Sequence, residues 1–277
     1  MKKLSLVLLL FGVVLFQNCK KDTEDTPQQE QVTDDEAKAV IDTDQAGDDI
    51  MDMVDVYAFD TTSSTASRST AHHQLPACVT QTVVRTGGSV NITWEFDAAG
   101  CTMPNGNTYR GTVTINRTFD PATHSVSGSV AFSNFSVNGV AIAGGFDFVR
   151  VRSNAAGHPQ STNNYDFTIT FVNGDVAQRS GTRVREWIQG FTTPRMRNDD
   201  IFLVTGNSHI VRRNGVVLDA VITTELRREV PCRHFVSGVI EITKNGQTAI
   251  LDYGNGTCDN EATLTMPNGT VRTITLR

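Results

Sequence analysis

The sequence of this 277-residue chain predicts an all-β fold of about twelve mostly antiparallel strands, arranged as a meander and preceded by a short N-terminal helix. From about residue 76 onward, runs such as SVNITWEF (89–96) and YDFTITF (165–171) alternate apolar and polar residues, as half-buried strands do. Because so many strands rarely form one flat sheet, we expect a curled sheet, a sandwich or a barrel. Asn-Gly, the strongest short hairpin signal, begins at seven positions, most of them between such runs: 105, 138, 173, 214, 245, 255 and 268.

A helix is expected over residues 33–58. Thr33 and Glu36 form a capping-box pattern at its start, and Gly47 is expected to split or weaken its middle. The helix could dock on a partner or pack on the edge of its own β-domain; we favour the second, because most amphipathic helices pack on their own chain. The apolar positions that recur at helical spacing are Ala37, Val40, Ile41, Ile50, Met53, Val54 and Tyr57.

The N-terminus has the features of an export signal. Lys2 and Lys3 precede an apolar run over residues 4–16, which is too short to span a bilayer as a helix but typical of a secretory leader. Cys19 follows directly after LFQN, and this arrangement resembles bacterial lipoproteins, whose leader is cut before a cysteine that then carries lipid. The resemblance implies a signal peptide over residues 1–18 and an acylated Cys19 that anchors the protein to the membrane. A plain periplasmic signal is the alternative.

Charge divides the chain into an acidic N-terminal part and a weakly basic remainder. Residues 19–60 contain fourteen Asp and Glu against three Lys, whereas residues 61–277 contain sixteen acids against nineteen bases, eighteen of them Arg. We interpret residues 19–32 as an acidic tether, 59–75 as a Ser/Thr-rich linker and 76–277 as the β-domain. No dominant basic patch indicates a nucleic-acid partner.

Four cysteines remain after Cys19, and an even number in an exported chain predicts disulfides. They lie in two related units, 78–119 and 232–277, each with two cysteines 23 or 26 residues apart, followed by an MPNG turn. The repeat favours pairing within each unit. None of the four lies in a C-x-x-C or Cys/His cluster, which argues against a zinc site. The expected pairs are Cys78–Cys101 and Cys232–Cys258.

Three stretches resemble β-rich outer-membrane lipoproteins of Bacteroidetes: RVREWIQG (183–190), DDIFLVTG (199–206), and GVIEITKNG with LDYGNGTCDN (238–246 and 251–260). The KKD that follows Cys19 is similar to the residues that follow the lipidated cysteine in those Bacteroidetes lipoproteins that are carried to the cell surface. The resemblance implies an outer-membrane location, on the cell surface or alternatively on the periplasmic face. It implies no activity.

A ligand-binding face is one interpretation of Arg183, Arg185 and Trp187. In an extended strand these alternate residues project from one side, and two guanidinium groups beside an indole suit an anionic glycan or a phosphate. The other interpretation, which we favour, is an exposed sheet face on which long arginine side chains cover apolar surface and offset Glu186, Asp199 and Asp200. An Arg face covered by the protein's own acidic residues would indicate a structural role.

A calcium site is one interpretation of Asp252, Asp259 and Glu261, because calcium takes many oxygen ligands. We favour turn chemistry, since Asp, Asn and Gly are the residues that tight turns need.

No catalytic motif is present, so the leading hypothesis is a non-catalytic binding or scaffolding domain for a surface glycan or an envelope protein. The alternatives are a carbohydrate-acting hydrolase that uses Glu186, Asp199 or Asp200 as carboxylates, and a purely structural envelope lipoprotein.

Overall fold

The structure is a computed structural model that describes residues 31–59, 75–193 and 196–276. In these ranges one helix, α1 (Asp34–Phe59), precedes thirteen strands, and a short 3-10 turn, η1 (Arg197–Asp199), lies between β7 and β8. The strands are β1 (Val79–Thr86), β2 (Ser89–Thr102), β3 (Thr108–Asp120), β4 (Ser125–Val137), β5 (Val140–Val151), β6 (Gln160–Thr170), β7 (Val176–Gln189), β8 (Ile201–Arg212), β9 (Val217–Glu229), β10 (Ser237–Lys244), β11 (Gln247–Asn255), β12 (Glu261–Thr265) and β13 (Val271–Thr275).

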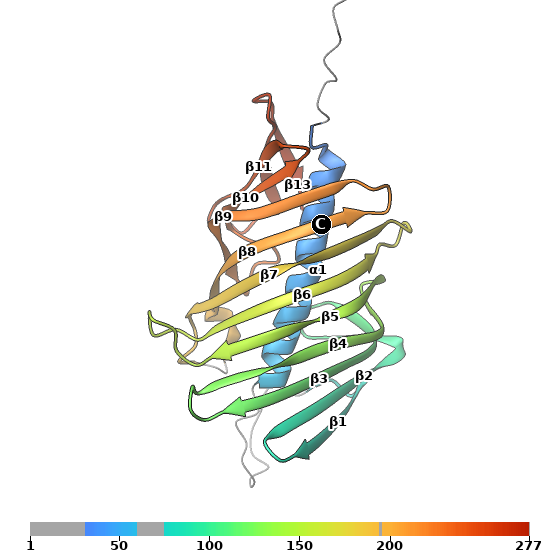
Figure 1. Ribbon diagram of the computed structural model, residues 1–277, viewed down its shortest axis with the longest axis vertical. Coiled ribbons are helices and arrows are strands. Elements are labelled where there is room, and N and C mark those ends of the chain that lie inside the picture. The colour runs from blue at the N-terminus through green and yellow to red at the C-terminus, as the bar shows by residue number, and fades with distance from the viewer. Residues whose placement is uncertain (1–30, 60–74, 194–195, 277) are drawn as a thin grey trace, which may run out of the picture.

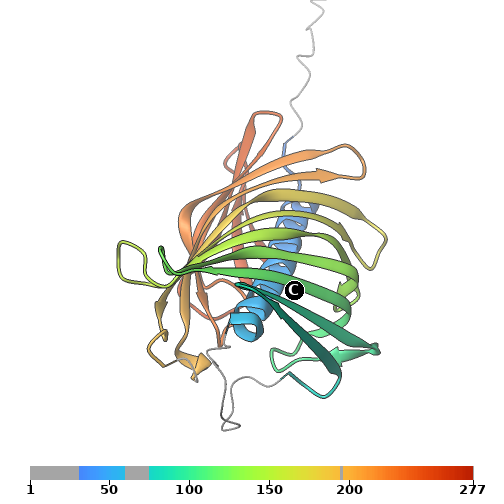
Figure 2. The same cartoon turned by 60° about the horizontal axis from the view of Figure 1, so that its bottom comes forward.

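All thirteen strands belong to one antiparallel sheet in which each strand pairs with its neighbours in the sequence. The strand order begins at β1 and ends at β13, so the sheet is open. It curls into a deep trough, and α1 crosses the strands on the concave side (Figures 1 and 2). The predicted all-β meander with an N-terminal helix is confirmed, and of the three arrangements expected, the curled sheet is the one formed.

Helix α1 lies at the centre of the core, so its expected position at the edge of the β-domain is wrong. Its C-terminal half packs with Trp94 and Phe167 in one apolar cluster, and its N-terminal half packs with Leu226 and Ile240 in a second. The sheet needs this helix because its concave face would otherwise expose both clusters to water. The helix residues in these clusters are Ala37, Val40, Ile41, Ile50, Met51, Met53 and Val54.

The predicted capping box is formed. The Thr33 backbone N–H donates to the Glu36 carboxylate at 2.8 Å, and the Glu36 N–H donates to the Thr33 hydroxyl at 3.3 Å. The helix continues through Gly47, so of the two effects expected there the split does not occur. A side chain there would bring its Cβ to 2.7 Å from Arg179 Nη1, so Gly47 allows a strand arginine to approach the helix closely.

The Asn-Gly pairs make two kinds of hairpin turn. Asn138 and Asn245 have positive φ and are each followed by a glycine with positive φ, as a two-residue type I′ turn requires. At Asn105, Asn173, Asn214 and Asn268 only the glycine has positive φ, and the loop is one residue longer. Gly256 instead donates its N–H to Val236, so the pair at 255 makes no hairpin.

The convex face of the sheet carries short polar side chains. One row of directly opposed residues crosses seven strands without a Lys or Arg, and its members are at least partly exposed. Arg179, Arg183 and Arg185 of β7 lie on the other side, where they contact α1. The row consists of Asn91, Asn116, Ser129, Asp147, Asn164, Thr182 and Asn207.

The expected leader and anchor lie outside the described residues. This applies to the signal peptide 1–18, to Cys19, to most of the tether 19–32 and to most of the linker 59–75, all of which stay predictions. Within the ranges that the structure describes, no helix has the length and apolar character needed to cross a membrane.

Candidate functional site

The arginines expected to form a ligand face lie beneath α1. Arg183 and Arg185 project from the concave side of β7, and each side chain is only 2% exposed. Opposite them α1 presents Asp44, Asp48 and Asp52, which share one helix face because they are four residues apart. The sequence does contain a signal for this burial, which our prediction missed: an acidic stripe in a helix that precedes an Arg-rich sheet.

The contacts across this interface are ion pairs with little water access. Asp44 Oδ1 accepts hydrogen bonds from Arg179 Nη2 and from Arg183 Nη2, the latter at 2.6 Å. Asp52 Oδ1 accepts from Arg185, and the second Asp52 oxygen lies 3.9 Å from Arg228 Nη2. Both interpretations of an exposed face are therefore wrong, because the arginines are buried and their acidic partners come from α1. An Arg face covered by the protein's own acids is the arrangement that we associated with a structural role.

Burial and the opposite charges act against each other on the pKa values of this interface. Burial raises the pKa of Asp48, although Arg183 and Arg185 oppose the shift, and its Oδ2 accepts no hydrogen bond from the described residues. Burial also acts to raise the pKa of Asp52, but Arg185 and Arg228 outweigh it and lower that pKa. Burial alone would lower the pKa of Arg185, but Asp52 raises it above its ordinary value. We conclude that a soluble anion does not reach these guanidinium groups.

Trp187 is half-buried and belongs to the core beside the 3-10 turn. Its ring stacks on Phe202 with centroids 5.6 Å apart and planes 22° apart, and it meets Phe191 edge-on. It therefore packs against other rings rather than offering a free aromatic face.

The three carboxylates considered for hydrolysis are not brought together at one site. Asp200 is buried beside Trp187, and burial raises its pKa to about 6. Asp199 accepts a hydrogen bond from the Thr193 hydroxyl at 2.7 Å. Glu186 pairs with His158 at 2.7 Å and projects from the opposite face of β7 to Trp187, because adjacent strand residues alternate.

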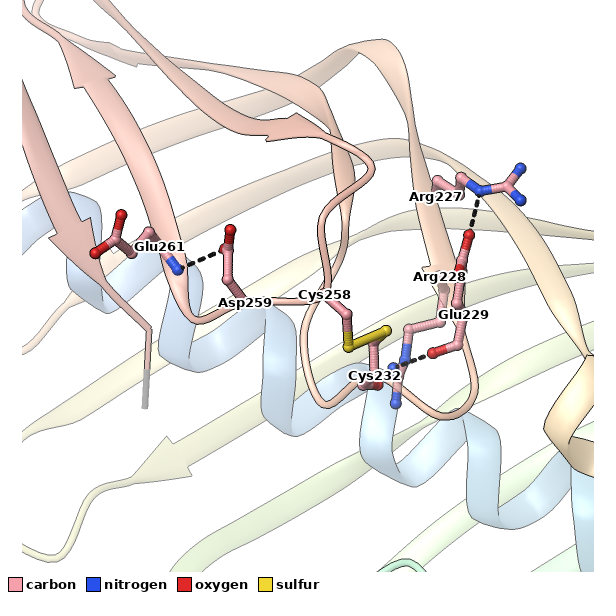
Figure 3. Close-up of a disulfide and its surroundings, with 7 residues drawn as sticks. All are labelled: Arg227, Arg228, Glu229, Cys232, Cys258, Asp259 and Glu261. Atoms are coloured by element: carbon pink, nitrogen blue, oxygen red, sulfur yellow. Dashed lines mark hydrogen bonds and ion pairs between the residues drawn. A yellow bond between two sulfur atoms is a disulfide. The ribbon is translucent and has the colours of Figure 1, made fainter.

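The residues considered for calcium are exposed and apart. Asp252 accepts the N–H of Gly254 at 2.8 Å, and Asp259 accepts the N–H of Glu261 at 3.0 Å, so both carboxylates cap turns. In Figure 3 the Glu261 carboxylate points away from Asp259. Across the described ranges, no three His, Cys, Asp or Glu side chains are grouped closely enough to hold a metal ion.

Both predicted disulfides are present. Cys78 bonds to Cys101 and Cys232 bonds to Cys258 (Figure 3), with Cα atoms 5.4 and 5.5 Å apart. Each bond joins the segment before one hairpin, β1–β2 or β10–β11, to the end of its second strand or the loop that follows it. The two related units therefore share one arrangement, and the second unit adds strand β12 before its MPNG turn.

A groove with a volume of about 690 Å³ runs along α1. The helix forms one wall, and the tips of the β4–β5 and β6–β7 hairpins form the other; Arg212 and the segment before β10 complete it. We call this the α1 groove. Its lining residues are Asp35, Lys38, Ala39, Ile41, Asp42, Gln45, Ala46, Asp49, Val137, Asn138, Val140, Phe171, Val172, Asn173, Asp175, Arg212, Arg233 and His234.

The α1 groove combines apolar surface with polar groups of both charges. Phe171 is half-buried in its wall, whereas Val172 at the hairpin tip is 78% exposed. Burial and the nearby Asp52 raise the pKa of Asp49 to about 6, and Gln45 donates a hydrogen bond to it at 3.0 Å. Burial lowers the pKa of His234. Such a groove can hold an uncharged or zwitterionic polar ligand.

The sequence pattern did not indicate this groove because its walls come from segments that are far apart in the chain. Comparison of the chain with known protein families, with curated proteins and with solved structures finds no match.

Proposed function

We propose that this is a lipid-anchored protein of the cell envelope whose all-β domain binds a ligand in the α1 groove without changing it chemically. The observation that supports the binding role is the groove itself. Its volume of about 690 Å³ lies within the range of about 300–1,000 Å³ that is typical of small-molecule sites. None of the three carboxylates considered for hydrolysis lines it.

The lining favours a surface glycan or a short polar segment of an envelope protein as the ligand. Asn173 and Gln45 line the groove; the Asn173 carbonyl accepts the Asp175 N–H and the Gln45 amide donates to Asp49. The Asn173 NH₂ and the Gln45 carbonyl are the amide groups that we assign to a hydroxyl-rich ligand. Phe171 and Val172 offer apolar surface beside them. This combination of apolar walls and a few polar groups is usual in ligand sites.

Glycan-array binding of the chain from residue 20 onward tests the groove. Val172→Arg places a long charged side chain at the groove wall and should weaken binding at least tenfold. Val221→Arg is the matched control, because Val221 is 47% exposed on the convex face of β9. Equal loss in both variants, or no glycan retained by the parent chain, would contradict a glycan site in this groove.

The anchor is tested separately. Metabolic labelling with a fatty acid should mark the parent chain, and Cys19→Ala should abolish the label because it removes the acylated thiol. Protease treatment of intact cells then distinguishes the cell surface from the periplasmic face. A chain that is labelled equally with and without Cys19 would refute lipidation at this residue.

A purely structural envelope protein is the second candidate. It is favoured by the neutralisation of Arg183 and Arg185 by the acids of α1. If the protein is purely structural, the Val172→Arg variant, expressed in a strain that lacks this protein, should restore envelope integrity as well as the parent chain does.

A further inference from the structure

Strand β1 forms one edge of the open sheet and pairs only with β2 among the described strands. A two-residue turn joins them, with Gly87 at positive φ, so Thr86 and Ser89 are a hydrogen-bonded pair. Hydrogen-bonded and non-bonded pairs alternate along an antiparallel ladder. The even-numbered residues of β1 therefore direct their backbone groups toward β2, and the N–H of Asp97 indeed donates to the carbonyl of Cys78.

The odd-numbered residues of β1 direct their backbone groups outward. The N–H of Val79 is satisfied by the Pro76 carbonyl at 2.9 Å. The other three odd-numbered residues are Gln81, Val83 and Arg85. Each directs an N–H and a C=O to the side of β1 that faces away from β2. These three residues are symmetric about Val83.

The edge lacks most of the features that usually prevent strand pairing. Strand β1 contains no Pro or Lys, and its register with β2 is unbroken over all eight residues. Val83 and Val84 are 39% and 53% exposed. The opposite edge, β13, has only five residues, and short edge strands resist pairing.

We propose that β1 is a self-association site, at which two copies of this chain pair antiparallel with Val83 on the two-fold axis. In this register Val83 lies opposite Val83 of the second copy, and Gln81 lies opposite Arg85. All six outward N–H groups, three from each copy, then meet outward carbonyls. Such a contact is isologous and closes as a dimer.

The side chains fit this register on both faces. Val83 meets its own copy on one face, and Val84 meets Thr82 on the other; β-branched pairs of this kind stabilise sheets. Arg85 faces the neutral Gln81 rather than a like charge. Shifting the axis by two residues to Arg85 would place two arginines opposite each other, which is unfavourable.

Sedimentation equilibrium of the chain from residue 20 onward tests the dimer. Val83→Pro removes only an outward N–H, and proline is tolerated at such edge positions, so β1–β2 pairing should persist. We expect the dimer dissociation constant to rise at least tenfold, and Val83→Ala, which keeps the N–H, to have a smaller effect. A parent chain that stays monomeric, or a Val83→Pro variant that dimerises equally well, would overturn the proposal.

Cross-linking tests the register independently. In a hydrogen-bonded pair the Cα atoms are about 5.5 Å apart, within the range for a disulfide. Val83→Cys should therefore give a covalent dimer on mild oxidation, whereas Val84→Cys, which lies opposite Thr82, should not. Equal cross-linking of both variants, or open-ended oligomers in which β1 pairs with β13 of the next copy, would refute this register.

Discussion

Arg183 Nη2 lies 2.6 Å from Asp44 Oδ1, although the two residues are 139 positions apart in the sequence. Both side chains are 2% exposed. Asp44 also accepts from Arg179, so one carboxylate of the helix neutralises two arginines of β7. This contact joins α1 to the concave face of the sheet and lies away from solvent.

Asp44→Ala should lower the free energy of unfolding by about 3–5 kcal/mol, because it leaves Arg179 and Arg183 buried without their carboxylate. Urea denaturation measures the change. Asp34→Ala is the control: it removes an exposed pair with Arg272 and should cost less than about 1 kcal/mol. Equal effects of the two substitutions would show that the buried pairs add nothing specific.

A chain that begins at residue 75 should not fold, because it lacks α1 and would expose both apolar clusters of the trough. A chain that begins at residue 31 keeps the helix and its cap and should unfold cooperatively. Circular dichroism and binding of an apolar dye distinguish the two. A cooperative transition in the shorter chain would show that the sheet folds without the helix.

Asp49→Asn should stabilise the protein at neutral pH. Folding raises the pKa of Asp49 from 3.8 to about 6, so the folded state binds the proton more tightly than the unfolded state. The free energy of unfolding of the parent chain therefore falls as the pH rises from about 4 to about 6. The variant, which carries no charge at this position, should be more stable by at most about 3 kcal/mol at pH 7.

The advantage of Asp49→Asn should vanish below about pH 4, where the carboxyl is protonated in both states. Asp35→Asn, an exposed position on the same groove, serves as the control and should change little. Denaturation measured across this pH range checks both variants. A constant difference at every pH would show that the effect is not due to titration.

Replacing Cys232 and Cys258 together by Ser should lower the free energy of unfolding by about 3 kcal/mol, because the bond closes a loop of 26 residues. The corresponding change at Cys78 and Cys101 should cost a similar amount. Non-reducing peptide mapping identifies the pairs in the parent chain. A peptide that joins Cys78 to Cys258 would contradict this pairing.

Much of the fold is predictable from the sequence because its signals are local. Alternation in SVNITWEF places Trp94 in the core, and the Thr33–Glu36 pattern marks the start of α1. The repeated spacing of the cysteines gives the two disulfides. Gly47 shows the limit of local rules: low helix propensity suggested a break, but the helix continues and accommodates Arg179 there.

The sequence by itself determined the strands, their antiparallel order, the helix and its cap, and the cysteine pairs, because each depends on residues close in the chain or on a repeated pattern. Only the tertiary structure decided that α1 fills the trough and that Arg183 and Arg185 are buried. Alternation indicates that two arginines share a face, but not which element covers that face. Helix α1 covers that face and brings Asp44 to it, although the helix is far from β7 in the sequence. The α1 groove forms only because this helix lies in the trough of the sheet.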